Sequence, residues 1–194
     1  MYTLILVAYL LGSVNSAIVM CKLFGLPSPR SVGSGNPGAT NVLRLGNKTA
    51  AGLTLLSDVF KGIIPVVIGH LFHLPAASLC WIALAAVLGH VYPIYFAFKG
   101  GKGVATALGC LFAIHLLLGL AVGVVWLMMA ACFRFSSLAS IIALISAPIF
   151  GALFLGHATL VPLILMTFLI LYRHKSNVHK LMKGTESKLG VKSK

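Results

Sequence analysis

Glycines and small polar residues gather at "GSGNPGATN", Gly33 to Asn41, and residues of these types suit phosphate binding. We expect Asn36 to cap a short helix over Pro37–Leu45, because Asn is a favoured N-cap and Pro fits the first helical position. A helix N-terminus presents free N–H groups and a positive dipole end, which bind anions. The expected contacts are Ser34, Gly35, Asn36, Gly38, Thr40 and Asn41, and an ordinary turn at the membrane surface is the alternative.

Arg44 stands three and four residues after Asn41 and Thr40, so these side chains share one face of the predicted helix. A guanidinium is a planar donor that binds phosphate through two parallel hydrogen bonds. The same letters begin with the dinucleotide-binding pattern G-x-G-x-x-G, but no strand precedes them, so that interpretation fails.

A second candidate is "FKGGKGVAT", Phe98 to Thr106, in which two lysines flank two glycines. Glycine lets the backbone approach a ligand closely, and the lysines supply positive charge. The spacing is not that of a Walker A phosphate loop. The candidate ligand contacts are Lys99, Gly100, Gly101, Lys102 and Gly103, and a loop whose lysines only reach the membrane surface is the alternative.

Two further polar stretches follow long apolar runs. In "RFSSLAS", Arg134 to Ser140, either Ser136 or Ser137 is expected to cap the next helix, and capping alone is the alternative to ligand binding. The segment Tyr172 to Gly190 is strongly basic, and binding to anionic lipid head groups would account for much of its charge.

Acidic residues are scarce, because Asp58 and Glu186 are the only two in the chain. Two-metal chemistry and most divalent metal sites need several carboxylates, so we expect neither a metal nor a cofactor. The chain has no G-x-S-x-G nucleophile motif and no H-x-x-x-x-D motif. The chemistry that remains relies on positioning and charge stabilisation. Asp58 and Lys61, near the start of a predicted span, are either functional or a structural ion pair.

The composition is that of an all-α integral membrane protein, with 59% hydrophobic residues, 9% charged residues and a mean hydropathy of +1.04. The fourth apolar run is too long for one span, and "LLLGLAVG", Leu116 to Gly123, predicts a bend that leaves two short spans near Val104–Leu118 and Leu120–Phe133. The apolar runs are Thr3–Cys21, Ser57–Phe72, Ala76–Phe98, Val104–Phe133, Leu138–Leu155 and Thr159–Leu171.

Charge decides between six and seven spans. With seven, the predicted outer linkers carry none of the 15 Lys and Arg residues, as the positive-inside rule requires. We therefore predict one domain, residues 1–194, with seven transmembrane helices, the N-terminus outside and the C-terminus cytoplasmic. All four polar elements then lie on the cytoplasmic side, which predicts one membrane-level site for phosphate-bearing substrates.

Three long motifs carry a resemblance to a known family. "GSGNPGATNVLR", "GHVYPIYFAFKGGKGVAT" and "RHKSNVHKLMKGTESKLG" are similar to the signatures of the bacterial acyl-phosphate-dependent glycerol-3-phosphate acyltransferases, the PlsY family, and "RFSSLAS" also resembles a stretch of that family. The resemblance covers essentially the whole chain. It implies a seven-helix inner-membrane enzyme that transfers an acyl group from acyl phosphate to glycerol 3-phosphate, giving lysophosphatidic acid and phosphate, without acyl-CoA or metal.

The resemblance also implies roles for individual residues. Ser34 and Arg44 match essential residues of the first signature, and Lys102 with its glycines matches a glycerol 3-phosphate site. "HKSN" and "GTES" depart slightly from the family wording. The matching residues of the third signature are His174, Asn177 and Glu186, of which the glutamate has a structural role, and Asp58, Lys61 and His90 complete the candidates.

Two hypotheses of function follow. In the first, the glycerol hydroxyl attacks the acyl carbonyl while a donor phosphate oxygen takes the proton, with an acyl-Ser34 intermediate as the rival mechanism. The expected partners are membrane lipid and an enzyme that supplies acyl phosphate, and no nucleic acid is expected. In the second, the protein transports phosphate or an organophosphate, although no internal repeat is visible.

Overall fold

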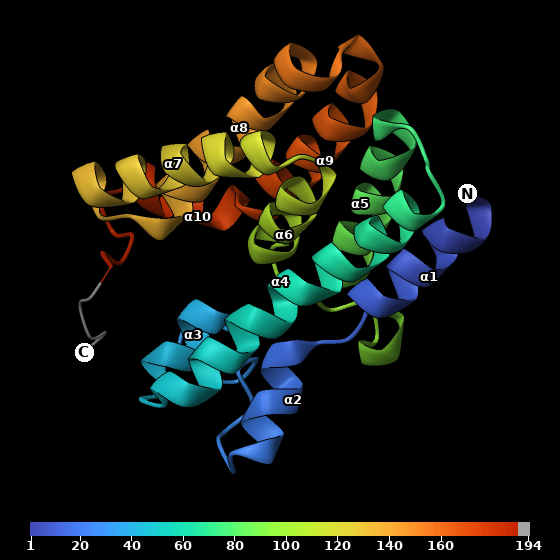
Figure 1. The fold of residues 1–194 in the computed structure, drawn as a ribbon. Helices are drawn as coiled ribbons and strands as arrows, with labels where there is room; N and C mark the ends of the chain where they lie inside the picture. The colour runs from blue at the N-terminus through green and yellow to red at the C-terminus, as the bar shows by residue number, and fades with distance from the viewer. Residues whose placement is uncertain (190–194) are drawn as a thin grey trace.

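Residues 1–189 of the computed structural model are helical throughout their regular elements, and this part of the chain contains no strand (Figure 1). The apolar segments form helices because a membrane-spanning backbone must satisfy its hydrogen bonds internally. The helices, in chain order, are α1 (Tyr2–Gly12), α2 (Ser16–Leu23), α3 (Ala39–Arg44), α4 (Lys48–Leu71), α5 (Ala76–Val91), η1 (Ile94–Phe96), α6 (Val104–Ile114), α7 (Leu116–Phe133), α8 (Ser136–Leu155), η2 (His157–Thr159), α9 (Leu160–Arg173) and α10 (Lys175–Met182).

Five segments are long and apolar enough to cross a membrane, and they correspond to α1 with α2, α4, α5 with η1, α7 and α8. A sixth results if α9 and α10, which meet at 57°, count as one bent span. The remaining apolar helix, α6, has only 11 residues. The predicted all-helical, multi-pass membrane fold is therefore confirmed, whereas the number of seven crossings stays a prediction.

The first apolar run, Thr3–Cys21, lies within one candidate span, Tyr2–Leu23, which consists of the two helices α1 and α2. They break at Asn15, whose side chain accepts a hydrogen bond from the Ile18 N–H at 3.2 Å. The predicted start of the second run is wrong, because α4 begins at Lys48 rather than Ser57, where Asn47 caps it by accepting from the Ala50 N–H at 2.8 Å. As a result, Asp58 and its partner lie inside α4 and not near its start.

The long apolar run from Val104 to Phe133 splits, as predicted, but at His115 rather than within Leu116–Gly123. His115 has extended backbone angles, φ −159° and ψ 125°, and separates α6 from α7. The residues of the predicted bend continue α7, which reaches 18 residues. The sequence did not place this break correctly, because the helix is interrupted at one residue, His115, with no Gly or Pro at that position to mark it.

Helices α4 and α6 pack closely because glycine occupies their contact. A Cβ atom at Gly62 would overlap the Thr106 carbonyl oxygen, and one at Gly109 would overlap the Val59 carbonyl oxygen. Small residues allow such close helix approach in membrane proteins. This contact brings the charged residues of α4 beside the first turn of α6.

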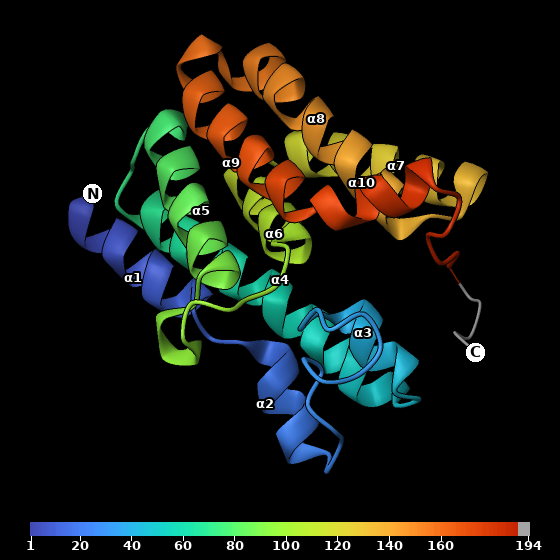
Figure 2. The same ribbon diagram turned by 180° about the vertical axis from the view of Figure 1, so that it is seen from behind.

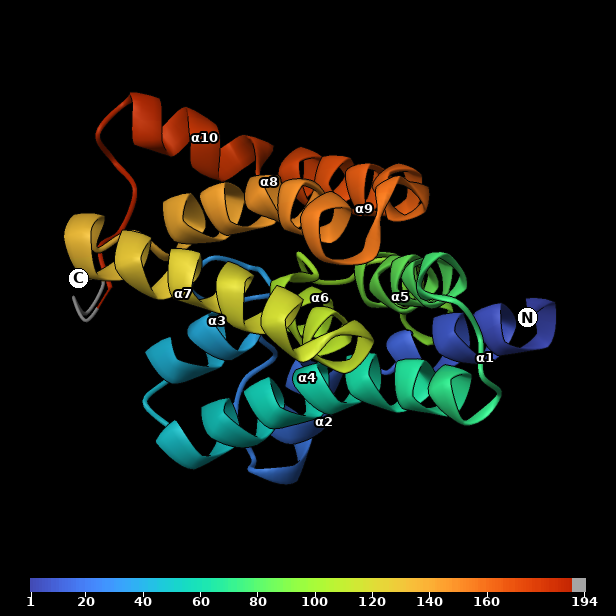
Figure 3. The same ribbon diagram turned by 45° about the horizontal axis from the view of Figure 1, so that its top comes forward.

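The two ends of the helical assembly differ in what they carry. The N-terminus and the α8–α9 connection lie at one end, whereas α3 and the C-terminal segment lie at the other (Figures 1 and 2). Helices α7 and α8 run side by side, with α9 beside α8, and α10 continues from α9 at an angle (Figure 3). The polar elements singled out from the sequence therefore gather at the α3 end.

Candidate active site

A cavity of about 420 Å³ lies where the first glycine loop, the second glycine loop and the C-terminal helices meet. Its lining includes four cations and no carboxylate, so it is a positively charged hollow suited to an anion. The lining residues are Ser34, Gly35, Asn36, Pro37, Tyr92, Gly100, Lys102, Tyr172, Arg173, Lys175, Ser176, Asn177 and Lys180.

Asn41 shapes the first loop. Its side-chain Nδ2 donates to the carbonyl oxygens of Pro29 at 2.7 Å and Val32 at 3.1 Å, and its Oδ1 accepts from the Ser34 N–H at 2.9 Å. Gly33 has a φ of +61°, and a Cβ atom there would overlap the Asn41 amide. Asn41 is buried and does not line the cavity, so it holds the loop that presents Ser34.

The predicted helix Pro37–Leu45 is wrong at its start. Helix α3 covers only Ala39–Arg44, its N-cap is Gly38, and no side chain caps it. The reason is that Gly38 is extended, with φ −152° and ψ 164°, so Pro37 lies outside the helix and Asn36 is not the N-cap. Asn36 lines the cavity instead, whereas Thr40 is exposed in the first turn of α3.

The second loop is clamped by backbone hydrogen bonds before it reaches Lys102. The N–H groups of Gly100 and Gly101 donate to the carbonyl oxygens of Val91 at 3.1 Å and His90 at 3.2 Å. Their carbonyl oxygens accept from the Arg173 guanidinium at 3.1 and 3.3 Å. Gly103, with φ +88°, then turns the chain into α6. The loop is therefore held by the end of α5 on one side and by the Arg173 side chain of α9 on the other.

Lys102 projects from this loop into the cavity, where its Nζ donates to Asn177 Oδ1 at 2.6 Å. Burial lowers the pKa of Lys102 to about 8. The positive charges of Lys180, Arg44 and Arg173 act in the same direction, and the Glu186 carboxylate opposes them. A cation that is poorly solvated and already repelled by neighbours gains much from an arriving anion.

This pKa predicts a bell-shaped dependence of kcat/KM on pH. The cationic form of Lys102 prevails below its pKa of about 8, so if Lys102 binds a substrate phosphate, we expect that binding to weaken as pH rises through that value. The substrate phosphate becomes a dianion above about pH 6, which sets the acid limb. Steady-state rates measured from pH 5.5 to about 9.5 check this, and a rate that stays constant above the pKa of Lys102 would contradict it. A stability control is incubation at each pH followed by assay at neutral pH.

The C-terminal segment joins the third polar stretch to the site through Glu186. Glu186 Oε1 accepts from Ser137 Oγ at 2.7 Å and from Asn177 Nδ2 at 2.7 Å. Asn177 thereby links the carboxylate to Lys102. The prediction that a serine caps α8 is wrong, because Phe135 is the N-cap and no side chain caps the helix. Ser137, rather than Ser136, contacts this network.

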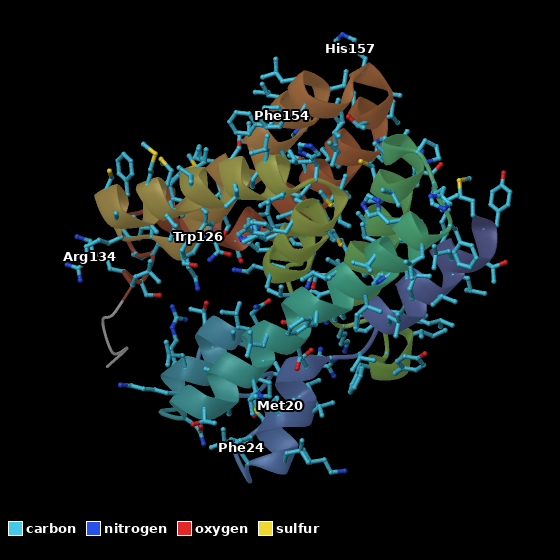
Figure 4. The ribbon with its side chains drawn as sticks, viewed as in Figure 1. Met20, Phe24, Trp126, Arg134, Phe154 and His157 are labelled. Atoms are coloured by element: carbon cyan, nitrogen blue, oxygen red, sulfur yellow. The ribbon has the colours of Figure 1, made fainter. Side chains whose placement is uncertain are left out.

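Arg44 and His174 lie at the border of the cavity rather than in its lining. Arg44 Nη2 donates to Ser187 Oγ at 2.7 Å, which ties the end of α3 to the C-terminal segment. His174 is buried at the joint of α9 and α10, where its Nδ1 lies 2.8 Å from the Ile170 carbonyl oxygen. Arg134, at the end of α7 (Figure 4), donates to the Leu189 carbonyl oxygen at 3.4 Å. The C-terminal segment thus closes one side of the site.

A second hollow of about 320 Å³ adjoins the first. Arg30 Nη2 donates to the carbonyl oxygens of Phe96, at 3.1 Å, and Lys99, which holds the second loop against the first. Arg173 lines both hollows, and its guanidinium carbon lies 5.9 Å from the Tyr92 ring centroid. The lining of the second hollow is Arg30, Gly35, Pro37, Phe98, Lys99, Gly100 and Arg173.

Sequence reasoning missed several of these residues. Arg173 stands in the basic segment that the sequence singled out, but nothing local distinguishes it from a cation that binds lipid. The residues of the two hollows that were not predicted are Arg30, Pro37, Tyr92, Phe98, Tyr172, Arg173, Lys175, Ser176 and Lys180. In residues 1–189, no three His, Cys, Asp or Glu side chains gather closely enough to share a metal ion.

Comparison with known proteins agrees with this architecture. A family model described as "Glycerol-3-phosphate acyltransferase" matches residues 2–184. Proteins named glycerol-3-phosphate acyltransferase are similar to this chain in Burkholderia cenocepacia (strain HI2424) and in Legionella pneumophila (strain Corby). The first is 50% identical over 193 residues, covering 97% of this chain and 91% of the relative. The second is 47% identical over 190 residues, covering 97% and 69%.

Two solved structures share the fold. One is a crystal structure of PlsY (YgiH), an integral membrane glycerol 3-phosphate acyltransferase, in its glycerol 3-phosphate form, with a TM-score of 0.91, 43% identity, and coverage of 97% of this chain and 95% of that one. The lysophosphatidic acid form has a TM-score of 0.89, 42% identity and the same coverage. On the family model, the relatives and the shared fold together, the chain belongs to the glycerol-3-phosphate acyltransferase family of integral membrane proteins.

Proposed function

We propose that this protein transfers an acyl group from acyl phosphate to the 1-hydroxyl of sn-glycerol 3-phosphate, the first acylation of phospholipid synthesis. The observation that carries the proposal is the cavity whose lining holds Lys102, Arg173, Lys175 and Lys180 without a carboxylate. Such a hollow binds a phosphate dianion, and the family relationship supports glycerol 3-phosphate as that ligand. Measuring phosphate release from purified protein with acyl phosphate and glycerol 3-phosphate, together and singly, tests it.

We further propose that the second hollow receives the phosphate of the acyl donor. Arg173 lies between the two hollows, so one guanidinium would neutralise both anions at close range. The glycerol oxygen forms a bond to the acyl carbon, the bond from that carbon to the phosphate oxygen breaks, and the hydroxyl proton passes to a phosphate oxygen. The donor phosphate serves as base because Glu186 is occupied by Ser137 and Asn177 and does not line the cavity.

Ser34 has two candidate roles in this reaction. In direct transfer, its hydroxyl and the N–H groups of the loop orient a phosphate or stabilise the developing oxyanion. In the rival mechanism, Ser34 itself becomes acylated. Incubation with labelled acyl phosphate alone separates the two, because acylated protein that then transfers its label to glycerol 3-phosphate would refute direct transfer. We expect no label on the protein. No metal or cofactor enters either mechanism.

The membrane arrangement belongs to the same proposal. We propose one domain, residues 1–194, in the bacterial inner membrane with seven crossings, the N-terminus outside and the site cytoplasmic, supported by the distribution of Lys and Arg. A soluble partner enzyme could then deliver acyl phosphate from the cytoplasm. Labelling of single cysteines, placed at Lys48 and His73 in a cysteine-free variant, tests the orientation. We expect an impermeant thiol reagent added to whole cells to label position 73 only.

The alternative function, transport of phosphate or an organophosphate, makes a different prediction. A transporter would exchange labelled glycerol 3-phosphate across liposome membranes without acyl phosphate and without forming lysophosphatidic acid. We expect the opposite result, with phosphate release only when both substrates are present. Counterflow without turnover would reject the acyltransferase proposal.

Arg44→Lys tests whether activity depends on the planar pair of hydrogen-bond donors of the Arg44 guanidinium. The substitution keeps the positive charge but removes the planar pair of donors, so we expect activity to fall at least about tenfold. Initial rates at saturating and limiting glycerol 3-phosphate measure the loss. Lys22→Arg, at the exposed end of α2, is the reciprocal control and should match the parent protein. Full activity of Arg44→Lys would show that Arg44 serves only as a membrane-orientation signal.

A further inference from the structure

A cluster of four polar side chains lies buried beneath the loop that carries Lys102. Asp58 and Lys61 come from α4, His90 from α5 and Thr106 from α6. All four are buried, with exposed fractions of 3%, 7%, 7% and 0%. Burying charged groups inside a membrane protein is costly, which makes a cluster of this kind a candidate for a function. The cavity lining includes none of the four, which means that they act through other residues.

The contacts within the cluster converge on His90. Asp58 Oδ1 lies 2.7 Å from Lys61 Nζ and 3.5 Å from His90 Nδ1. Thr106 Oγ1 lies 3.3 Å from the same His90 nitrogen. The ring is therefore fixed by a carboxylate from α4 and a hydroxyl from α6, which meet because glycine lets those helices approach closely.

His90 in turn contacts the glycine loop in two ways. Its carbonyl oxygen accepts from the Gly101 N–H at 3.2 Å. The other ring nitrogen, Nε2, lies directly under Gly101, where even an added Cβ atom would overlap it. Gly101 precedes Lys102, so a displaced ring would displace the lysine from the position in which it meets Asn177.

The cluster also reaches the break between α1 and α2, because Lys61 Nζ donates to the Val14 carbonyl oxygen at 2.7 Å. Val14 lies between α1, which ends at Gly12, and α2, which begins at Ser16. Helix α2 begins two residues later and leads toward the first glycine loop. The charged pair therefore connects α4 both to the break between α1 and α2 and to His90 beneath the second loop, and neither partner could be replaced by an apolar residue without losing one of these contacts.

We propose that Asp58, Lys61 and His90 are positioning residues that hold the Gly100–Lys102 backbone in the geometry needed to bind the substrate phosphate. The proposal rests on the proposed role of Lys102 in phosphate binding. The single variants of the charged pair would leave an unpaired buried charge and risk misfolding. The informative variant is therefore Asp58→Asn with Lys61→Met, which removes both charges together.

The first experiment compares this double variant with Thr54→Val. Thr54 is buried on α4, one turn before Asp58, and its hydroxyl donates to the Ala50 carbonyl oxygen within the same helix. We expect the double variant to raise the KM for glycerol 3-phosphate by about tenfold or more, as displaced binding groups do. Hydrogen exchange should accelerate over residues 98–103 but not in α8, and Thr54→Val should change neither. A lower kcat with unchanged KM and unchanged exchange would mean that the pair is only structural, and would overturn the proposal.

The second experiment changes His90 and covers the case in which the double variant does not fold. His90→Asn keeps a polar group facing Asp58 and Thr106 but removes the ring edge under Gly101, whereas His90→Ala removes both. We expect KM and loop exchange to rise in the order parent, Asn, Ala. A His90→Ala protein with the parent KM overturns the proposal. Lys102→Met in the same assays tests the proposed phosphate site separately from the positioning role. If this variant binds glycerol 3-phosphate like the parent, the proposed site itself is wrong.

Discussion

Lys102→Met is expected to reduce kcat/KM by about 100- to 1000-fold, which is the usual loss when one preorganised donor to a charged transition state is removed. Lys102 is the cation that the second loop projects into the first cavity, and within residues 1–189 its side chain makes one hydrogen bond, donated to Asn177 Oδ1 on α10 at 2.6 Å. Methionine preserves the length and the apolar part of the side chain. The loss therefore measures the ammonium group and not the packing.

The measurement is the initial rate at varied glycerol 3-phosphate concentration. The stability of the variant is followed by its thermal unfolding midpoint in detergent. Because burial lowers the pKa of Lys102 to about 8, removing its charge does not threaten the fold and we expect the midpoint to stay constant or rise. Lys22→Met, an exposed lysine at the end of α2, is the matched control and should leave the rate unchanged. Equal rates for the two variants would remove Lys102 from the mechanism.

Arg173→Lys is expected to reduce kcat/KM by about 10- to 100-fold although it conserves charge. The Arg173 guanidinium donates to the carbonyl oxygens of Gly100 and Gly101 and lies over the Tyr92 ring, while lining both hollows. A lysine carries its three donors on a single nitrogen and lacks the planar fork of Arg, so we expect it not to hold both carbonyl groups while facing both anions. We therefore expect the KM values of both substrates to rise together.

Arg134→Lys is the matched control for this prediction, because Arg134 is exposed and, among the described residues, its guanidinium donates one long hydrogen bond, of 3.4 Å, to the Leu189 carbonyl oxygen. Its KM values should stay within about twofold of the parent, as for most surface substitutions. If Arg173→Lys raised the KM of one substrate only, Arg173 would serve one hollow and not the boundary between the two.

The two glycine loops show which features of the site could be predicted from the local sequence. Residue types alone predicted two phosphate-binding loops, and the structure brings both to one cavity together with Asn177. The helix start after the first loop was wrong, because the extended conformation of Gly38 excludes Pro37 from α3. Asn41 looked like a ligand contact, but its amide is satisfied by three backbone groups of the loop. The sequence shows the type of a side chain, but it does not show which groups that side chain forms hydrogen bonds with.

The sequence by itself determined the membrane class, the helical fold and the residue types of the site, because hydropathy, charge and glycine content are local properties of the chain. It did not determine where α4 begins, since a single capping residue, Asn47, decides that boundary. Only the tertiary structure joined Ser137, Asn177 and Glu186, and placed Asp58 beside His90 beneath Gly101. Except for the contact between Asn177 and Glu186, these contacts join residues far apart along the chain, and they depend on helix approach distances that no local pattern encodes.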